Sequence, residues 1–337
     1  NITIAHSKDK KPIYAKDLNA HGPMTVLLRE AIRPNAVQTL ENNLAIIHGG
    51  PFANIAHGCN SILATKTALK LSDYVITEAG FGADLGAEKF LNIKCREAGI
   101  KPDCVVLVAT IRALKMHGGI EKDELKKENL NALKKGLPNL ERHINNIKKF
   151  GLEIVVGINH FITDTEKEIK IIEDYCNKMK VKFSVCTHWS HGSKGAKNLA
   201  NHVVEICKKN NKNNFKHLYT NETPILKKIE VIAKELYGAN VVECDDKIKK
   251  QIDEMEKAGF IKFPVCIAKT QYSFSTDSKL KGAPSGHALT IREVRLSSGA
   301  KFIVVICGSI MTMPGLPKTP AADKIKLNKK GEIEGLF

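Results

Sequence analysis

The sequence predicts an α/β protein in which helices flank a largely parallel sheet. The first observation is a series of short apolar, β-branched runs, which lie at 44–47, 74–77, 105–110, 154–159, 183–187, 263–268 and 302–307. The second is a set of helix-like stretches between most of these runs, at 85–98, 121–150, 164–179, 194–209 and 224–237. Strands that alternate with helices favour parallel pairing. The runs also lack strict alternation of apolar and polar residues, as expected when helices cover both faces of a sheet.

A polar, Asn-rich stretch at 210–223 separates two portions of the chain. The 337 residues are enough for roughly two domains that each bury a core. We therefore expect one α/β portion at 1–210 and a second at 211–337. The second portion is expected to contain one or two helices, a strand, a loop over 273–286 and a last strand. Beyond residue 311, closely spaced Pro and Gly residues predict an irregular tail.

The formal net charge of +16 comes mainly from Lys, because 45 of the 52 basic residues are Lys and 7 are Arg. Recognition of phosphates and bases in nucleic-acid grooves favours the planar fork of Arg. We therefore interpret the charge as a solvated Lys-rich surface and expect no nucleic-acid partner. Such a surface still attracts phosphorylated or polyglutamylated small ligands.

The sequence favours neither a membrane-spanning protein nor a metal-binding protein. No run of about 18 apolar residues occurs, so we expect no transmembrane helix. The nine Cys residues form no C-x-x-C pair, which is typical of reduced thiols in a cytoplasmic protein. His48 and His57 could share a metal ion, but no neighbouring Cys or carboxylate completes a ligand set. We therefore predict no metal site.

Polar and Gly-rich clusters follow most of the predicted strands. They lie at 78–84, 110–119, 159–165 and 187–194, with shorter clusters at 269–270 and 308–309. In parallel sheets, ligands collect beyond the carboxyl ends of the strands. Helix starts at that edge offer free N–H groups to an anion. The sequence therefore predicts a ligand site along this edge.

Neither of two common nucleotide-binding patterns occurs with its usual spacing. Gly80, Gly82 and Gly86 are one residue too widely spaced for a dinucleotide fingerprint, and no acidic residue follows at the expected distance. We favour a turn that needs Gly for close backbone approach, while a nicotinamide oxidoreductase stays an open alternative. No G-x-x-x-x-G-K-[ST] phosphate cradle occurs in these residues.

Two aromatic residues stand at predicted strand ends. Phe161 precedes a helix N-cap at 163–165, and Trp189 is the only Trp of the chain. A pair of loop aromatics can clamp a flat heterocycle, with each stack contributing on the order of 1 kcal/mol. The alternative, a Trp that caps the core, stays equally open on composition alone.

Several sequence blocks together closely resemble the formate–tetrahydrofolate ligase (10-formyltetrahydrofolate synthetase) family. The blocks lie at 34–41, 48–61, 78–90, 108–119, 163–165, 186–189, 311–317 and 335–337. They are distributed over the whole chain. The resemblance implies an incomplete P-loop NTPase-like core at 1–210, which binds nucleotide and folate, and a C-terminal domain at 211–337 that closes the active-site cleft.

The resemblance also implies an activity. Members of this family are ATP-dependent ligases of one-carbon metabolism, in which ATP converts formate into formyl phosphate. Tetrahydrofolate then takes the formyl group, giving 10-formyltetrahydrofolate, ADP and phosphate. The implied cofactors are magnesium and a monovalent cation, either potassium or ammonium. The implied partners are formate, ATP and tetrahydrofolate polyglutamate, and the implied state is a cytoplasmic homotetramer.

Four residues match binding positions of the family. Phe161 and Trp189 match the aromatics that sandwich the pterin of the folate, and Phe81 lies in the Gly-Phe-Gly loop near that pocket. Pro284 matches a position that lines the adenine end of the nucleotide site. Arg112 and His117 lie in a family motif, but no chemical step follows for them. No catalytic residue and no metal ligand is therefore assigned.

The sequence departs from the family pattern in two ways. Ile162, His191 and Ser193 replace other residues beside the expected folate clamp. The family's P-loop segment is also absent from these residues, so we expect the chain to be the larger, C-terminal part of a ligase that is inactive alone. The alternative hypothesis is a non-catalytic folate-binding or assembly module derived from the ligase by truncation.

Overall fold

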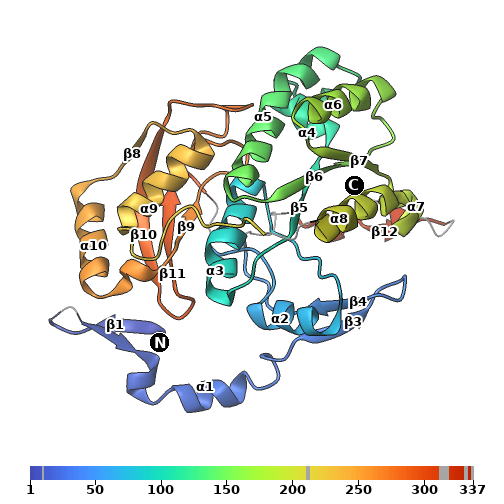
Figure 1. Ribbon diagram of the computed structural model, residues 1–337. Coiled ribbons are helices and arrows are strands. Elements are labelled where there is room, and N and C mark those ends of the chain that lie inside the picture. Colours follow the sequence, from blue (N-terminus) through green and yellow to red (C-terminus); the bar gives the residue numbers. More distant parts are fainter. Residues whose placement is uncertain (10, 210–212, 311–318, 330–332, 335–337) are drawn as a thin grey trace.

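The structure is a computed structural model that describes residues 1–9, 11–209, 213–310, 319–329 and 333–334 (Figure 1). The family blocks at 311–317 and 335–337, and most of the predicted irregular tail, lie outside the described residues. The architecture is α/β, as predicted. Two sheets lie side by side, with helices α3 and α5 between them (Figure 1).

The first sheet is parallel and has the strand order β5-β6-β7. Its strands are β5 (Cys104–Ala109), β6 (Glu153–Asn159) and β7 (Lys182–Cys186). All three were predicted to within about one residue. The helices that follow or connect them are α4 (Ile111–His117), α5 (Leu130–Lys149), α6 (Glu166–Lys178), α7 (His188–His191) and α8 (Lys197–Lys209).

The second sheet is mixed, with the strand order β8-β10-β11-β9. Only β10 and β11 pair in antiparallel fashion. The elements are α9 (Ile225–Ile232), β8 (Val241–Glu243), α10 (Asp246–Lys257), β9 (Val265–Ala268), β10 (Ala288–Ser297) and β11 (Phe302–Cys307). The predicted strands at 263–268 and 302–307 and the loop at 273–286 are confirmed, whereas β8 and β10 were not predicted.

The N-terminal residues form small antiparallel ladders and exposed helices. They comprise β1 (Thr3–His6), β2 (Pro12–Tyr14), α1 (His21–Leu27), β3 (Asn35–Gln38), β4 (Leu44–Ile47) and α2 (Ile62–Leu71). The predicted strand at 44–47 exists, but it pairs with β3 in a hairpin rather than in a parallel sheet. The predicted strand at 74–77 is wrong, because this segment pairs with no strand in the described part of the chain.

Several predicted helices begin later or contain tighter and wider turns. The stretch at 85–98 is helical from Ala83 but includes two π-helical segments before α3 (Cys95–Ala98). The stretch predicted at 121–150 becomes regular only from Leu130, where the Asn129 side chain accepts from the Ala132 N–H and caps α5. The shorter segments are the π-helical turns Ala83–Ala87, Phe90–Lys94 and Ala233–Tyr237, the 3₁₀ turns Ala15–Leu18, Lys122–Glu124, Gly192–Ala196, Phe260–Lys262 and Ala321–Asp323, and the strands β12 (Lys326–Leu327) and β13 (Ile333–Glu334).

Helix α5 contacts the first sheet and also the turn at Ala233–Tyr237, where Arg142 and Asn146 donate to the backbone carbonyls of Tyr237 and Leu236. Its buried positions Leu133, Leu137, Leu140, Ile144 and Ile147 repeat every three or four residues, so they form one apolar face. One hydrophobic core extends from Cys59 to Cys307 and includes residues of both expected domains. The boundary near 210 therefore stays a prediction. No helix among the described residues is both long and apolar enough to cross a membrane.

Candidate functional site

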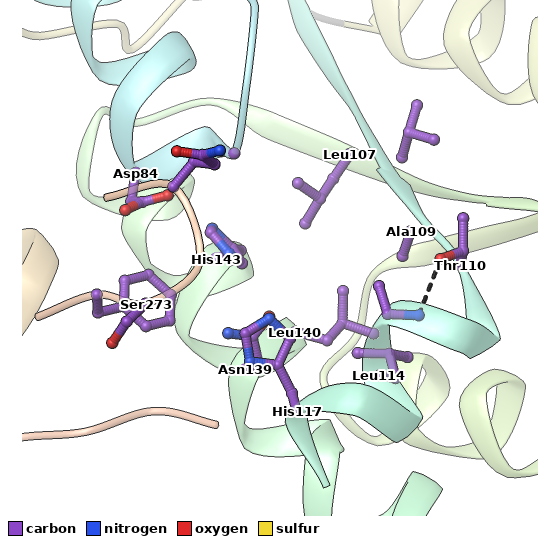
Figure 2. A pocket seen from close by; sticks show the side chains of 15 residues that line it. Asp84, Leu107, Ala109, Thr110, Leu114, His117, Asn139, Leu140, His143 and Ser273 are labelled. Carbon is purple, nitrogen blue, oxygen red and sulfur yellow. Dashed lines mark hydrogen bonds between the residues drawn. The ribbon is translucent and has the colours of Figure 1, made fainter. Parts of the chain in front are cut away.

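A cavity of about 180 Å³ lies at the carboxyl end of β5 (Figure 2). Its walls come from the π-helical turn at Ala83–Ala87, from α4 and α5, and from the loop that follows β9. The lining residues are Gly82, Asp84, Leu107, Val108, Ala109, Thr110, Ala113, Leu114, His117, Asn139, Leu140, His143, Gln271, Ser273 and Phe274. The cavity lies at the strand edge where the sequence predicts ligands to collect.

A buried ion pair stands at one wall of this cavity. Asp84 Oδ2 lies 2.8 Å from Lys269 Nζ, and both side chains are almost completely buried. Lys269 also donates to the backbone carbonyls of Thr270 and Ser273. Burial by itself would raise the pKa of Asp84, but the positive charge of Lys269 and the hydrogen bonds outweigh it, so the pKa lies below its usual value. The Asp84 carboxylate therefore stays ionised at neutral pH, and its contact with Lys269 joins the π-helical turn to the end of β9.

Two histidines line the cavity in their neutral form. Burial, together with nearby positive charge, lowers the pKa of His117 to about 4. Its Nδ1 accepts the Gly282 N–H at 3.2 Å, which assigns the proton to Nε2. Burial also lowers the pKa of His143, whose Nδ1 has no hydrogen-bond partner and whose ring packs 4.6 Å from that of Phe274. Near neutral pH, each imidazole is therefore uncharged and has one N–H donor and one acceptor nitrogen.

The loop at 282–286 is fastened to the same cavity wall. Asn139 Nδ2 donates to the Gly282 carbonyl at 2.8 Å, and His117 accepts from the Gly282 N–H. Pro284, the predicted nucleotide residue, lies two positions further along and is half-buried. The loop that carries the predicted nucleotide residue is thus held beside the cavity by Asn139 and His117, which both line it.

The two predicted folate aromatics lie at the ends of neighbouring strands. Phe161 follows β6, and Trp189 lies in the one-turn helix α7 after β7 rather than in an irregular loop. The Trp189 indole N–H donates to the His160 carbonyl at 2.7 Å, so the two segments are in contact. Asp164 fixes the turn around Phe161, because its carboxylate accepts the Phe161 N–H at 2.9 Å. Trp189 is 58% exposed, which favours a surface role over a core cap.

Phe81, the third predicted folate residue, has an unusual backbone. It adopts a positive φ of 65° and is 45% exposed, although it is not Gly. Such residues carry strain and are concentrated at functional sites. Phe81 immediately precedes Gly82, which lines the cavity.

The Gly residues around Phe81 serve close packing. A Cβ on Gly86 would clash with the Gly80 carbonyl, and the Gly80 N–H bonds to the Gly58 carbonyl at 3.0 Å. The interpretation as a turn that needs Gly is therefore supported. The predicted strand directly before this turn is wrong, because residues 72–80 form no strand.

The two candidate metal histidines have separate structural roles. His48 bonds to Ser61 Oγ at 2.6 Å and to the Ala31 carbonyl at 2.8 Å, whereas His57 packs edge-on against Phe302. Within the described ranges, no group of three or more His, Cys, Asp or Glu side chains could hold a metal ion.

The residues that depart from the family pattern lie in both segments of the predicted clamp, with Ile162 next to Phe161 and with His191 and Ser193 just after Trp189. Ile162 is 83% exposed, and His191 Nδ1 lies 3.0 Å from Thr187 Oγ1 within the α7 turn. The Ser193 N–H donates to Glu41 Oε1 at 2.9 Å. This backbone bond, together with a bond from the Ser193 hydroxyl, lowers the pKa of the Glu41 carboxyl. Glu41 lies in the turn of the β3–β4 hairpin, so this hairpin contacts the segment that carries Trp189.

Sequence reasoning missed several residues of the site. Lys269 and Asp84 fell within the predicted clusters at strand ends, but nothing indicated that they pair across 185 positions. Asn139 and His143 lie within a long amphipathic helix, where no sequence signal distinguishes them from solvated positions.

Residues 1–337 match the family model described as formate–tetrahydrofolate ligase. The chain belongs to this family. Among curated formate–tetrahydrofolate ligases, the one from Pelagibacter ubique is 68% identical over 337 residues. Those from Ruegeria pomeroyi and Sinorhizobium fredii are each 58% identical over the same length. Each alignment covers the whole of this chain and 60% of the relative, so the chain spans about 60% of the length of these ligases.

Proposed function

We propose that this chain contributes the folate clamp and part of the nucleotide wall to a formate–tetrahydrofolate ligase. The single observation that carries the proposal is the contact between the Phe161 and Trp189 segments at the ends of β6 and β7, in a chain of this family. The reaction would be the ATP-dependent formylation of tetrahydrofolate by formate, giving 10-formyltetrahydrofolate, ADP and phosphate.

The chemistry requires activation of formate. A carboxylate is a poor electrophile until one of its oxygens becomes part of a leaving group. In the proposed reaction, ATP transfers a phosphoryl group to formate, the N10 amine of tetrahydrofolate attacks the formyl carbon, and phosphate leaves while the amine loses a proton. The task of the protein is then to position the partners and to stabilise charge.

Three groups of residues would bind different parts of the substrates. Phe161 and Trp189 would hold the two faces of the pterin, with Phe81 nearby. Pro284 would contact the base end of the nucleotide, and the adjoining cavity would receive neighbouring polar atoms at the neutral His117 and His143. Neutral imidazoles avoid adding positive charge there, while still offering hydrogen bonds.

The magnesium and monovalent cation that the resemblance implies have no assigned ligands among these residues. No group of three or more His, Cys, Asp or Glu side chains in the described segments could hold a metal. We therefore assign no residue to magnesium or to the monovalent cation. These ions, the cytoplasmic location, the homotetramer and the polyglutamate preference stay predictions of the resemblance.

The folate clamp is tested by truncating its exposed aromatic. Trp189→Ala is expected to weaken tetrahydrofolate binding by about 1–3 kcal/mol, by analogy with aromatic stacking on bases. Isothermal titration calorimetry on the 337-residue chain measures this change. Trp189→Phe should retain most of the affinity, and Tyr74→Ala, which truncates another exposed aromatic, should have no effect. An affinity that is unchanged in Trp189→Ala would remove Trp189 from the site.

The alternative function is a non-catalytic folate-binding or assembly module. The observation in its favour is that residues 1–337 contain no G-x-x-x-x-G-K-[ST] sequence. We expect the 337-residue chain to bind tetrahydrofolate without releasing ADP from ATP and formate. ADP release above background would contradict this expectation and favour a chain that is catalytic by itself.

A further inference from the structure

We propose that Arg112 is a positioning residue for Phe161, covering one face of the phenyl ring and leaving the other face for a flat ligand. The inference rests on the proposed folate clamp. The Arg112 guanidinium carbon lies 4.0 Å from the centroid of the Phe161 ring, within the range of a cation–π contact. Its Nη2 also donates to Thr163 Oγ1 at 3.2 Å. Arg112 therefore contacts both the ring and the turn that carries it.

Within the described part of the chain, no acidic group competes with Phe161 for the Arg112 guanidinium. No carboxylate pairs with Arg112 among the residues that the structure describes, and its buried Nε has no hydrogen-bond partner. A half-buried Arg is usually paired with an acidic group or hydrogen-bonded through all its nitrogens. Here the electron-rich face of Phe161 takes the place of the missing carboxylate.

The sheet order indicates which side of the Phe161 turn remains open to a ligand. Arg112 follows β5, Phe161 follows β6 and Trp189 follows β7, and these strands are adjacent in that order. Arg112 and Trp189 therefore approach the Phe161 turn from opposite sides. A guanidinium at 4.0 Å leaves no room for a second flat group on the same face. A ligand stacked between Phe161 and Trp189 consequently uses the face that Arg112 does not cover.

Helix α4, which carries Arg112, is held rigidly. Lys115 Nζ lies 2.9 Å from Glu168 Oε1, and both side chains are buried. Glu168 also accepts the Thr165 N–H, which completes the cap of α6 directly after the Phe161 turn. The buried Glu168 carboxylate thus connects helix α4, which carries Arg112, to the start of α6, which follows the Phe161 turn.

Close packing restricts α4 further. A Cβ on Gly118 would clash with the Ala132 carbonyl, and one on Gly136 would clash with the Leu114 carbonyl. The backbones of α4 and α5 therefore touch where Gly allows it, and α4 cannot shift without disturbing α5. Arg112 is presented to Phe161 from a fixed base.

The test uses the 337-residue chain and two variants of Arg112. Arg112→Met keeps the length of the side chain but removes its charge and planar fork, whereas Arg112→Lys keeps the charge alone. We expect Arg112→Met to weaken the binding of tetrahydrofolate about 5- to 30-fold, the range that a partly desolvated cation–π contact supplies. Arg112→Lys should recover only part of this loss. Arg29→Met is the matched control, because the Arg29 side chain is 74% exposed.

A neutral ligand separates positioning from charge attraction. Calorimetry is repeated with 6-methyltetrahydropterin, which carries the ring but no glutamate. Positioning predicts an equal loss for both ligands in Arg112→Met. A loss for tetrahydrofolate alone, or full recovery in Arg112→Lys, would mean that Arg112 binds the anionic tail and would overturn the proposal.

A ligand-free measurement keeps this inference distinct from the proposed function. Trp189 is the only Trp, and its indole bonds to the carbonyl that precedes Phe161. Loosening of the Phe161 turn should therefore lower the fluorescence anisotropy of Trp189 in Arg112→Met but not in Arg29→Met, with an unchanged thermal unfolding midpoint. If the wild-type chain binds neither ligand, the proposed function fails, while this anisotropy still decides whether Arg112 positions the turn. Equal anisotropy in all three proteins would overturn the positioning role.

Discussion

The N-terminal 80 residues and the sheet between residues 241 and 307 have similar apolar content but opposite burial. Every residue of β9 and β11 is buried, because sheet neighbours and helices cover them. Among the described residues of 1–80, the buried ones are limited to Ala15, Asn54, Cys59, Ala64 and Thr65. Large apolar side chains such as Leu27, Leu40 and Ile76 are exposed there.

The difference shows that hydrophobicity produces burial only where an element has a partner face. One face of the second sheet packs in the main hydrophobic core, and the other packs against Ile93 and the loop residues Ile55 and Ala56, so its apolar runs are removed from water. The N-terminal hairpins have two strands each, and two-stranded sheets are only marginally stable by themselves. We therefore expect the free energy of unfolding to respond very differently to substitutions in the two regions.

The largest expected effect comes from the second sheet. Ile303 is completely buried in β11, so Ile303→Ala should lower the free energy of unfolding by about 2–5 kcal/mol through lost burial and a residual cavity. Leu40 is fully exposed at the β3–β4 turn, and Leu40→Ala should change it by less than about 0.5 kcal/mol. Urea unfolding measures both. A loss in Leu40→Ala that equals the loss in Ile303→Ala would contradict the comparison.

The same contrast explains which strands could be predicted. The runs that became β5, β6, β7, β9 and β11 are continuous and apolar, and most residues of β6, β9 and β11 are buried. Strand β10 was missed because Arg292, Glu293 and Arg295 interrupt its apolar residues, while its ladder with β11 holds it in place. The segment at 74–77 has strand-like residues, but without a neighbouring strand they stay extended and exposed, and Ile76 is 90% exposed.

The sequence predicted only those parts of the site whose residues directly follow neighbouring strands. Phe161 and Trp189 follow adjacent parallel strands, so the rule for strand ends brought them together. The Asp84–Lys269 pair and the Glu41–Ser193 bond join residues 185 and 152 positions apart. No local pattern encodes such a distance, because each partner alone is compatible with a solvated surface.

Glu88 gives an intermediate effect, in the helical segment between the two regions. Its side chain is fully buried, Asn92 Nδ2 donates to Oε1 at 2.8 Å, and Oε2 has no partner. Burial raises the pKa of this carboxyl from an ordinary value of 4.5 to about 7. The folded state thus holds its proton longer than the unfolded state, so the contribution to stability is fully present below pH 4.5 and is lost as the pH rises through about 7.

Glu88→Gln should remove this pH dependence. At pH about 8 the variant should be more stable than the wild type by on the order of 2–3 kcal/mol, whereas at pH about 5 the two should be nearly equal. Urea unfolding at both pH values provides the measurement. A difference between variant and wild type that is the same at both pH values would show that Glu88 does not titrate in this range.

The smallest expected effect lies where the exposed N-terminal region contacts the candidate site. Glu41 accepts the Ser193 N–H and the Ser193 hydroxyl, and both groups lie at the surface. Ser193→Gly removes only the hydroxyl bond, so tetrahydrofolate affinity should change at most a few-fold, as is usual for exposed polar contacts. Glu41→Ala removes both bonds and should lower the fluorescence anisotropy of Trp189, four residues before Ser193. Glu30→Ala, which removes an exposed carboxylate paired only within its own segment, should leave it unchanged. If Glu41→Ala also leaves the anisotropy of Trp189 unchanged, the β3–β4 hairpin does not support the Trp189 segment. The N-terminal region would then contribute little to the binding site, as it is expected to contribute little to stability.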